Sequence, residues 1–237
     1  MMNVSGKWIF IFSLLLFQTG LLAQQTACSG YLDPVKAELN KKWPHNKTIN
    51  IVFHGHSVPS GYFATPQVNT LKAYPHLTLC AVKEKYPNAV VNVITTSIGG
   101  EQSEQGALRF ENEVLCHRPD VLYIDYALND RGIGILRSET AWRKMIEAAL
   151  KYGCKIILMT PTPDLTEDIK NDHTPLQQHS EMIRRLAVEY NVGLVDSYKA
   201  FRDLANKGEN IKMYMSQSNH PNEKGHEVVA QLLGSWY

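Results

Sequence analysis

Four short stretches of the sequence hold side chains suited to nucleophilic catalysis. They are "GHS" with Ser57, "SIGGE" with Gly100, "ALND" with Asn129 and "HPNEKGH" with His220. A serine hydroxyl becomes an effective nucleophile when a base within about 3 Å takes its proton, and histidine has the pKa for that work near neutrality. A glycine N–H and an asparagine amide can donate to the oxyanion of a tetrahedral intermediate. These residue types indicate acyl transfer through a serine.

The segments between these stretches predict the elements that must position them. Apolar, β-branched runs occupy residues 48–54, 89–95, 120–128, 155–160 and 192–196, and helical spacing occupies residues 138–152, 174–191, 197–207 and 222–236. Apolar runs without strict alternation, joined by helix-length connections, are typical of a parallel sheet covered on both faces. The sequence therefore predicts an α/β fold, a three-layer α/β/α sandwich with a central parallel sheet of about five strands.

The order of the motifs fits this sheet. Ligands of such folds bind outside the carboxyl ends of the strands. Ser57, Gly100 and Asn129 follow the first, second and third runs, while His220 precedes the last helix and can fold back over the same edge. No repeat, low-complexity tract or linker interrupts residues 24–237, which are expected to form one domain.

In order and setting, these four residues resemble the signature residues of the SGNH/GDSL hydrolase superfamily. "GHS" stands where the family has GDS, "SIGGE" matches the turn whose last glycine donates to the oxyanion, "ALND" resembles GxND, and "HPNEKGH" matches HPNxxGH. The resemblance spans residues 53–226. It implies a flavodoxin-like serine esterase that needs no metal or cofactor. Ser57 would be the nucleophile, His220 the base, and Gly100 and Asn129 the oxyanion donors.

The sequence departs from the family pattern at two positions. The family has an aspartate three residues before the histidine, where this chain has Gln217, and His56 replaces the aspartate of GDS, which supports the turn. Exchanging a triad acid for an amide costs about 10⁴ in a serine protease. A backbone carbonyl could orient His220 in a Ser–His dyad, Asp164 after the fourth run could substitute, or the site could be weakened. The dyad is favoured because nucleophile, base and donors are all present.

Each motif residue also has a simpler interpretation. Ser57 could cap a helix, Gly100 could serve only a tight turn, and Asn129 could cap the segment that follows it. His226 is expected to pack or cap rather than to catalyse. His54 is left without a role.

The N-terminal residues and the charge balance bear on location and partners. Residues 1–23 carry a lysine, an apolar run and then "LLA", which predicts a signal peptide cleaved after Ala23 and a secreted or periplasmic protein; a buried N-terminal helix is the alternative. The apolar run is too short to span a bilayer, so no stable membrane insertion is expected after cleavage. The net charge of +1 gives no electrostatic basis for binding nucleic acid.

The cysteines allow several states. Export would let Cys28, Cys80, Cys116 and Cys154 pair, and four cysteines permit three connectivities. "QTAC" lies beyond the apolar run and lacks a leucine three residues before Cys28, which disfavours a lipid anchor. Cys154 opens an apolar run and is expected to be buried. No cysteine–histidine spacing suggests a metal site.

The expected function is a secreted serine esterase that removes O-acetyl groups from a polysaccharide or oligosaccharide, so the partner is an acylated carbohydrate. Tyr62, Phe63 and Arg131 near the expected cleft could hold a sugar or could pack. One alternative is a lipase, lysophospholipase or thioesterase on the same fold. Another is a non-catalytic carbohydrate-binding relative, which the missing aspartate motivates. The oligomeric state is left open.

Overall fold

The computed structural model describes residues 30–237, so the predicted signal peptide and Cys28 lie outside the described residues. Five parallel strands form one sheet in the order β2-β1-β3-β4-β5. Their bounds are Thr48–Gly55 (β1), Val90–Thr95 (β2), Val121–Asp125 (β3), Lys155–Met159 (β4) and Gly193–Val195 (β5). This order confirms the predicted α/β class and its flavodoxin-like topology, and it places the topological switch point between β1 and β3.

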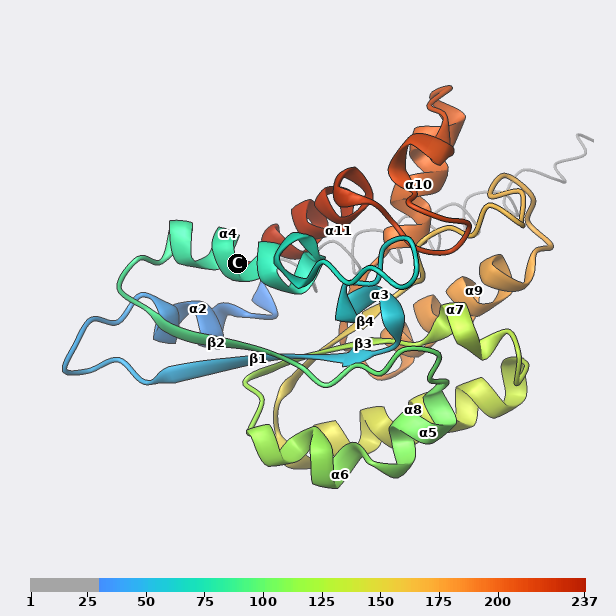
Figure 1. Cartoon of the computed structure of the whole chain (residues 1–237). Helices are drawn as coiled ribbons and strands as arrows, with labels where there is room; N and C mark the ends of the chain where they lie inside the picture. The colour runs from blue at the N-terminus through green and yellow to red at the C-terminus, as the bar shows by residue number, and fades with distance from the viewer. Residues whose placement is uncertain (1–29) are drawn as a thin grey trace, which may run out of the picture.

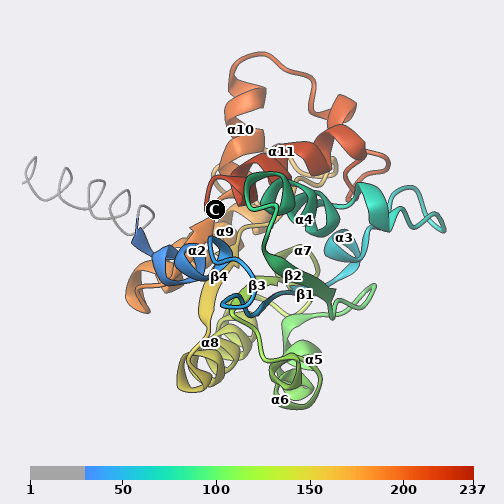
Figure 2. The same cartoon turned by 90° about the vertical axis from the view of Figure 1, so that its left-hand side faces the viewer.

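Helices cover both faces of the sheet and make the molecule three-layered (Figure 1). One face carries α2 (Asp33–Leu39), α4 (Tyr74–Lys85), α10 (Ser197–Asn206) and α11 (Glu223–Gly234). The other carries α5 (Ser103–Leu108), α6 (Phe110–Glu113), α8 (Ile135–Tyr152) and α9 (Pro175–Glu189). Figure 2 shows α4, α10 and α11 on one side of the strands and α5, α6 and α8 on the other. Short 3-10 helices are η1 (Thr70–Lys72), η2 (Leu115–His117) and η3 (Ile211–Tyr214).

The burial of the strands explains why polar and apolar residues do not alternate along the apolar runs. Successive side chains of β3 point to opposite faces, so Tyr123 joins the core beneath α4 and α11 while Leu122 and Ile124 join the core beneath α8 and α9. All five residues of β3 are buried. Both faces of the central strands are covered by helices, so both must be apolar.

Side-chain caps start the last three helices. Thr174, Asp196 and Asn222 each accept a hydrogen bond from a backbone N–H of the first helical turn, which satisfies a donor that the helix leaves unpaired. Asn222 starts α11 two residues after His220, so this cap also defines where the histidine loop ends.

A one-turn helix follows a strand directly at two places at the carboxyl end of the sheet, and the one after β3 departs from the sequence prediction. The third apolar run was expected to continue to residue 128, but β3 ends at Asp125 and α7 (Ala127–Asp130) follows at once. The N–H groups of Asn129 and Asp130 donate to the carbonyl of Tyr126, which turns the chain out of the sheet. Similarly, α3 (Ser57–Ser60) follows β1 directly. Within residues 30–237, no helix combines the length and the apolar character that crossing a membrane requires.

Candidate active site

Ser57 and His220 meet at the carboxyl end of the sheet. His220 Nε2 lies 2.9 Å from Ser57 Oγ, although the two residues are 163 positions apart in the sequence. Ser57 is 7% exposed and His220 is 6% exposed. The hydroxyl is thus within direct hydrogen-bonding distance of an imidazole, and both groups are largely buried.

The turn that presents Ser57 is held by its neighbours. His56 is the N-cap of α3, and its Nδ1 accepts a hydrogen bond from Val58 N at 3.2 Å. Ser60 Oγ lies 2.9 Å from the carbonyl of His56 and 3.1 Å from the carbonyl of Ser97. Ser60 therefore links the turn at Ser57 to the loop that follows β2.

A buried carboxylate behind the turn was missed by the sequence analysis. Asp125 Oδ1 lies 3.4 Å from His56 Nε2, and Tyr74 donates its hydroxyl to Asp125 Oδ2 at 2.7 Å. Burial, followed by the charge of Asp125, raises the pKa of Tyr74. The histidine that replaces the aspartate of GDS thus faces an aspartate supplied by β3. The signal for it was an acidic residue at the end of an otherwise apolar run.

The second ring nitrogen of His220 is bound by a main-chain group. Nδ1 lies 2.8 Å from the carbonyl oxygen of Phe63. A carbonyl only accepts, so Nδ1 carries the proton and the lone pair of Nε2 faces Ser57. Burial lowers the pKa of His220 below its ordinary value of 6.5; the Phe63 carbonyl opposes this shift and His56 adds to it. The imidazole is therefore neutral and able to accept a proton at pH 7.

Gln217, at the position of the family's aspartate, provides no acceptor for His220. Its Nε2 lies 2.9 Å from His220 Nδ1 and donates to Asn219 Oδ1 at 3.0 Å, while its Oε1 accepts from Thr65 N at 3.0 Å. Because Thr65 N–H needs the amide oxygen, the amide nitrogen faces the ring. Two donors cannot satisfy each other, which leaves the Phe63 carbonyl as the orienting group.

Asp164, the alternative acid, is engaged elsewhere. Its carboxylate accepts from Arg131 Nη2 at 2.6 Å and from Thr166 N and Oγ1 at 2.9 and 2.8 Å. Arg131 Nη1 donates to Glu167 at 2.6 Å. The contacts of His220 Nδ1 lie with Phe63 and Gln217 instead, so a backbone carbonyl rather than Asp164 orients the ring.

His226 is packed, as the sequence analysis anticipated. Its ring stacks on Phe63 with centroids 5.2 Å apart, and Nδ1 accepts from Tyr74 N at 3.2 Å. Burial, with a smaller contribution from His220, lowers the pKa of His226 to about 3. His226 thus holds Phe63, and the carbonyl of Phe63 in turn holds His220.

The candidate oxyanion donors lie on two segments in contact, Gly100 on the loop after β2 and Asn129 in α7. Gly100 has a φ of +79°, a conformation that favours glycine. Within residues 30–237, its N–H makes no hydrogen bond. Asn129 Nδ2 donates one proton to the carbonyl of Glu101 at 2.9 Å, and its other proton has no partner among the described side chains and backbone. Each donor thus retains an N–H for a ligand.

The three candidate sugar contacts take different positions. Phe63 is buried against His226, and Arg131 is held between two carboxylates. Tyr62 is half-buried, its ring centroid lies 6.0 Å from that of His220, and it lies next to Gly99. Among these three, Tyr62 is the side chain placed to touch a substrate.

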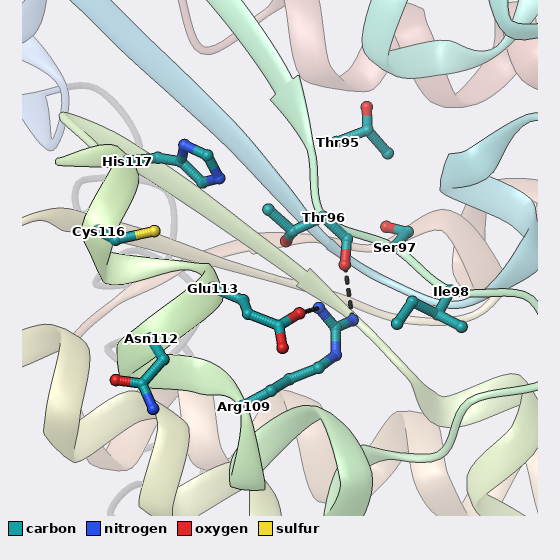
Figure 3. Close-up of a pocket in the computed structure, with 9 residues that line it drawn as sticks. All are labelled: Thr95, Thr96, Ser97, Ile98, Arg109, Asn112, Glu113, Cys116 and His117. Carbon is teal, nitrogen blue, oxygen red and sulfur yellow. Dashed lines mark hydrogen bonds and ion pairs between the residues drawn. The ribbon is translucent and has the colours of Figure 1, made fainter.

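A hollow of about 480 Å³ lies on the flank of the loop after β2 and contains neither Ser57 nor His220. Arg109 extends into it beneath Thr96 (Figure 3). Its lining residues are Thr95, Thr96, Ser97, Ile98, Arg109, Asn112, Glu113, Cys116 and His117.

The described cysteines are unpaired with one another. Cys80 and Cys116 are exposed, and Cys154 is buried as expected. Burial raises the pKa of the Cys154 thiol to about 11, so it is an inert core group. In the described part of the chain, no group of three or more histidine, cysteine or acidic side chains is arranged to hold a metal ion.

The chain is similar to a known protein family and to a bacterial protein. The model of the GDSL-like lipase/acylhydrolase family matches residues 53–228. The uncharacterized lipoprotein YqeF of Bacillus subtilis (strain 168) is 27% identical over an alignment that covers 59% of this chain and 70% of the relative.

Solved structures with the same fold include two acetyl esterases. A two-domain esterase active on acetylated mannans superposes with a TM-score of 0.71 at 20% identity, covering 87% of this chain and 52% of the esterase, so the chain spans about half the length of that protein. Axe2, an acetylxylan esterase from Geobacillus stearothermophilus, has a TM-score of 0.66 at 22% identity, covering 78% of this chain and 91% of Axe2. Catalytic mutants of Axe2 replace a serine, an aspartate or a histidine.

Proposed function

The chain belongs to the GDSL-like lipase/acylhydrolase family, and we propose that it is an ester hydrolase that works through Ser57 as nucleophile and His220 as general base. Gly100 N–H and the Asn129 amide are the proposed oxyanion donors. The observation that carries this proposal is the 2.9 Å contact between His220 Nε2 and Ser57 Oγ. It is supported by the Phe63 carbonyl, which holds the single ring proton on Nδ1 and so leaves Nε2 free to accept from the serine.

In the acylation step, Ser57 Oγ attacks the ester carbonyl carbon while His220 Nε2 takes the hydroxyl proton. The carbonyl oxygen becomes an oxyanion, which Gly100 N–H and the free proton of Asn129 Nδ2 stabilise. The intermediate then collapses: the bond to the leaving oxygen breaks, and His220 returns the proton to that oxygen. An alcohol leaves, and the acyl group remains as an ester on Ser57.

In the deacylation step, water takes the place of the alcohol. His220 Nε2 removes a proton from the water as its oxygen attacks the acyl carbon, and the same donors hold the second oxyanion. Collapse breaks the bond to Ser57 Oγ, which recovers its proton from His220. A carboxylic acid is released and the serine is regenerated.

The proposed substrate is an O-acetylated polysaccharide or oligosaccharide. Two proteins of the same fold support this substrate class, one an esterase active on acetylated mannans and one an acetylxylan esterase. Tyr62 beside His220 and Gly99 offers an aromatic surface at the mouth of the site. Aromatic rings with a polar edge suit a ligand that is apolar on one face and hydroxylated at its rim.

Acetate release tests this substrate class. The purified protein is incubated with acetylated xylan, mannan and pectin, and with esters of lengthening acyl chains on one alcohol. We expect acetate from at least one polysaccharide and rates that fall as the acyl chain grows. A preference for long-chain esters would instead support a lipase, lysophospholipase or thioesterase. Binding to glycans without any hydrolysis would indicate a carbohydrate-binding relative.

We further propose that the protein is exported and that cleavage follows Ala23. The support is the N-terminal pattern of lysine, apolar run and small residues, together with a relative described as a lipoprotein. Intact mass spectrometry of the protein recovered from its native cell checks this. The expected mature chain begins at Gln24, and a chain beginning at a lipid-modified Cys28 would contradict that cleavage site.

A further inference from the structure

The tip of the loop that carries Gly100 is open to solvent. Gly99 and Gly100 are exposed, and a Cβ placed on Gly100 would meet nothing within 4 Å. An oxyanion donor is effective only when its direction is set before the reaction. The direction of the Gly100 N–H must therefore be set by the residues on either side of it.

Glu101, the next residue, links both candidate donors through its backbone. Its N–H donates to the carbonyl of Ile98 at 3.2 Å and closes the turn over Gly99 and Gly100. Its carbonyl accepts from Asn129 Nδ2 at 2.9 Å and orients the asparagine amide. A shift of the Glu101 peptide would thus move both donors together.

The Glu101 side chain is anchored below the loop by three hydrogen bonds. Arg109 donates Nε to Oε1 at 2.7 Å and Nη2 to Oε2 at 2.5 Å, and Tyr126 donates its hydroxyl to Oε2 at 2.6 Å. The Glu101 side chain is 7% exposed and that of Arg109 is 12% exposed. A bidentate, largely buried pair of this kind is strong and directional.

Arg109 also binds the start of the same loop. Its Nη2 donates to the carbonyl of Thr96 at 2.6 Å, as Figure 3 shows, and its Nη1 lies 3.3 Å from Glu113. One guanidinium therefore joins residues 96 and 101 and fixes the span that contains Gly100. Its positive charge also offsets the Glu101 carboxylate, which would otherwise repel a developing oxyanion.

His54 of β1 and Gly106 of α5 complete the anchor. His54 Nε2 lies 3.1 Å from the Tyr126 hydroxyl oxygen and 3.3 Å from the carbonyl of Gly106. Burial, then the charge of Arg109, lowers the pKa of His54 to about 3, so the ring is neutral. Because the Gly106 carbonyl only accepts, Nε2 carries the ring proton and shares it between that carbonyl and the Tyr126 hydroxyl oxygen, while Tyr126 donates its own proton to Glu101. A Cβ at Gly106 would lie 2.3 Å from this hydroxyl, so glycine is required there.

From these contacts we infer that Glu101 is a positioning residue for the oxyanion hole, with Arg109 and Tyr126 as its anchors. The inference rests on the roles proposed above for Gly100 and Asn129. Glu101 acts through its peptide, whose N–H and carbonyl set the turn and the asparagine, while its carboxylate keeps that peptide in place. It touches neither the nucleophile nor the base.

The first test replaces Glu101 with its isostere. Glu101→Gln weakens the anchor without changing its volume, and with an acetyl ester as substrate we expect kcat to fall about 10- to 100-fold while KM changes less than about twofold. The matched control is Glu104→Gln, which removes a partner of Arg137 on the exposed side of α5 and is expected to leave kcat unchanged. Tyr126→Phe, which removes one of the three hydrogen bonds, is expected to lower kcat less than Glu101→Gln.

A double-mutant cycle separates positioning from a general structural role. In an Asn129→Ala background, Glu101→Gln is expected to lower kcat by less than about fivefold, because one of the donors it orients is already gone. If the loss of kcat in the double variant equals the product of the losses in the two single variants, the inference is overturned. It is also overturned if Glu101→Gln alone raises KM and leaves kcat unchanged. If Glu101→Gln does not fold, Tyr126→Phe replaces it in the double-mutant cycle with Asn129→Ala, and the same criteria apply. If the wild type hydrolyses esters and Glu101→Gln and Tyr126→Phe both have the wild-type kcat, the inference is wrong while the proposed function stands. If the wild type hydrolyses no ester, the proposed function is wrong and the inference falls with it.

Discussion

The two halves of the candidate site are held by different kinds of interaction. On the base side, His220 is oriented by a main-chain carbonyl and by the stacking of Phe63 on His226, all uncharged groups. On the oxyanion side, the loop around Gly100 is anchored by a buried carboxylate–guanidinium pair. The family's usual charge at the base is thus absent, and a buried charge pair lies beneath the donors instead.

This difference has a mechanistic consequence. Without a carboxylate beside Nδ1, the protonated state of His220 gains no stabilisation from a neighbouring negative charge, so the catalyst depends more on binding the oxyanion. Preorganised donors act strongly where water is excluded and the dielectric is low. Changes at the oxyanion donors should therefore rank directly after changes at the reacting pair, and changes at Gln217 should matter little.

Removal of either reacting group is expected to have the largest effect. Ser57→Ala and His220→Ala should each lower kcat by at least about 10⁴-fold, since the hydroxyl and its base act as one unit. Steady-state rates on an acetyl ester measure this, with the exposed His173→Ala as a control that keeps full activity. A His220→Ala enzyme within tenfold of wild type would show that another group is the base.

Asn129→Ala ranks second. Loss of one oxyanion donor typically costs about 10²–10³ in kcat. KM for an acetyl ester should change little, because the ground-state carbonyl carries less charge than the oxyanion. An Asn129→Ala enzyme with unchanged kcat and raised KM would assign the asparagine to substrate binding instead.

The pH dependence follows from the neutral base. Burial lowers the pKa of His220 below 6.5. We therefore expect kcat/KM to be constant from pH 7 upward and to fall only as the pH drops through the pKa of His220. Protonation removes the base, so each further pH unit below the His220 pKa should cost about tenfold. A pH–rate profile measures the midpoint. A midpoint above pH 7 would mean that a negative charge stabilises the imidazolium.

The smallest effects are expected at Gln217 and Asp164. Gln217→Ala and Asp164→Ala should each retain kcat within about tenfold of wild type, because neither side chain accepts the proton of Nδ1. Gln217→Asp restores the family's residue and should move the acid limb of the profile to higher pH. Damage from Asp164→Ala equal to that from His220→Ala would instead favour a displaced triad.

The sequence predicted those parts of the candidate site that local sequence patterns mark. Strand-end placement and the "HPN" setting were enough to expect Ser57 and His220 together, and the apolar runs were enough for the sheet. The group that orients His220 left no such pattern, because a main-chain carbonyl is present at every position. The sequence did name a backbone carbonyl as one option, but only the fold identifies it as that of Phe63.

The anchor of the oxyanion loop was equally hard to predict. Glu101 meets Arg109 from the end of one helix and Tyr126 from the end of a strand, and nothing in the spacing marks them as partners. A polar residue at the end of an apolar run, as at Tyr126 and Asp125, was the one available hint. The early end of β3 was missed for a related reason: Ala127 and Leu128 are apolar because they are buried in α7, not because they continue a strand.

Covalent labelling by a fluorophosphonate tests the central claim most directly, because the reagent needs both the activated serine and the oxyanion donors. The intact protein is treated at pH 7.5, its mass is measured, and the modified peptide is sequenced by fragmentation. One phosphonyl group on Ser57, lost in His220→Ala and slowed in Asn129→Ala, is the predicted result. A folded wild-type protein that gains no mass, or gains it at another residue, would contradict the account.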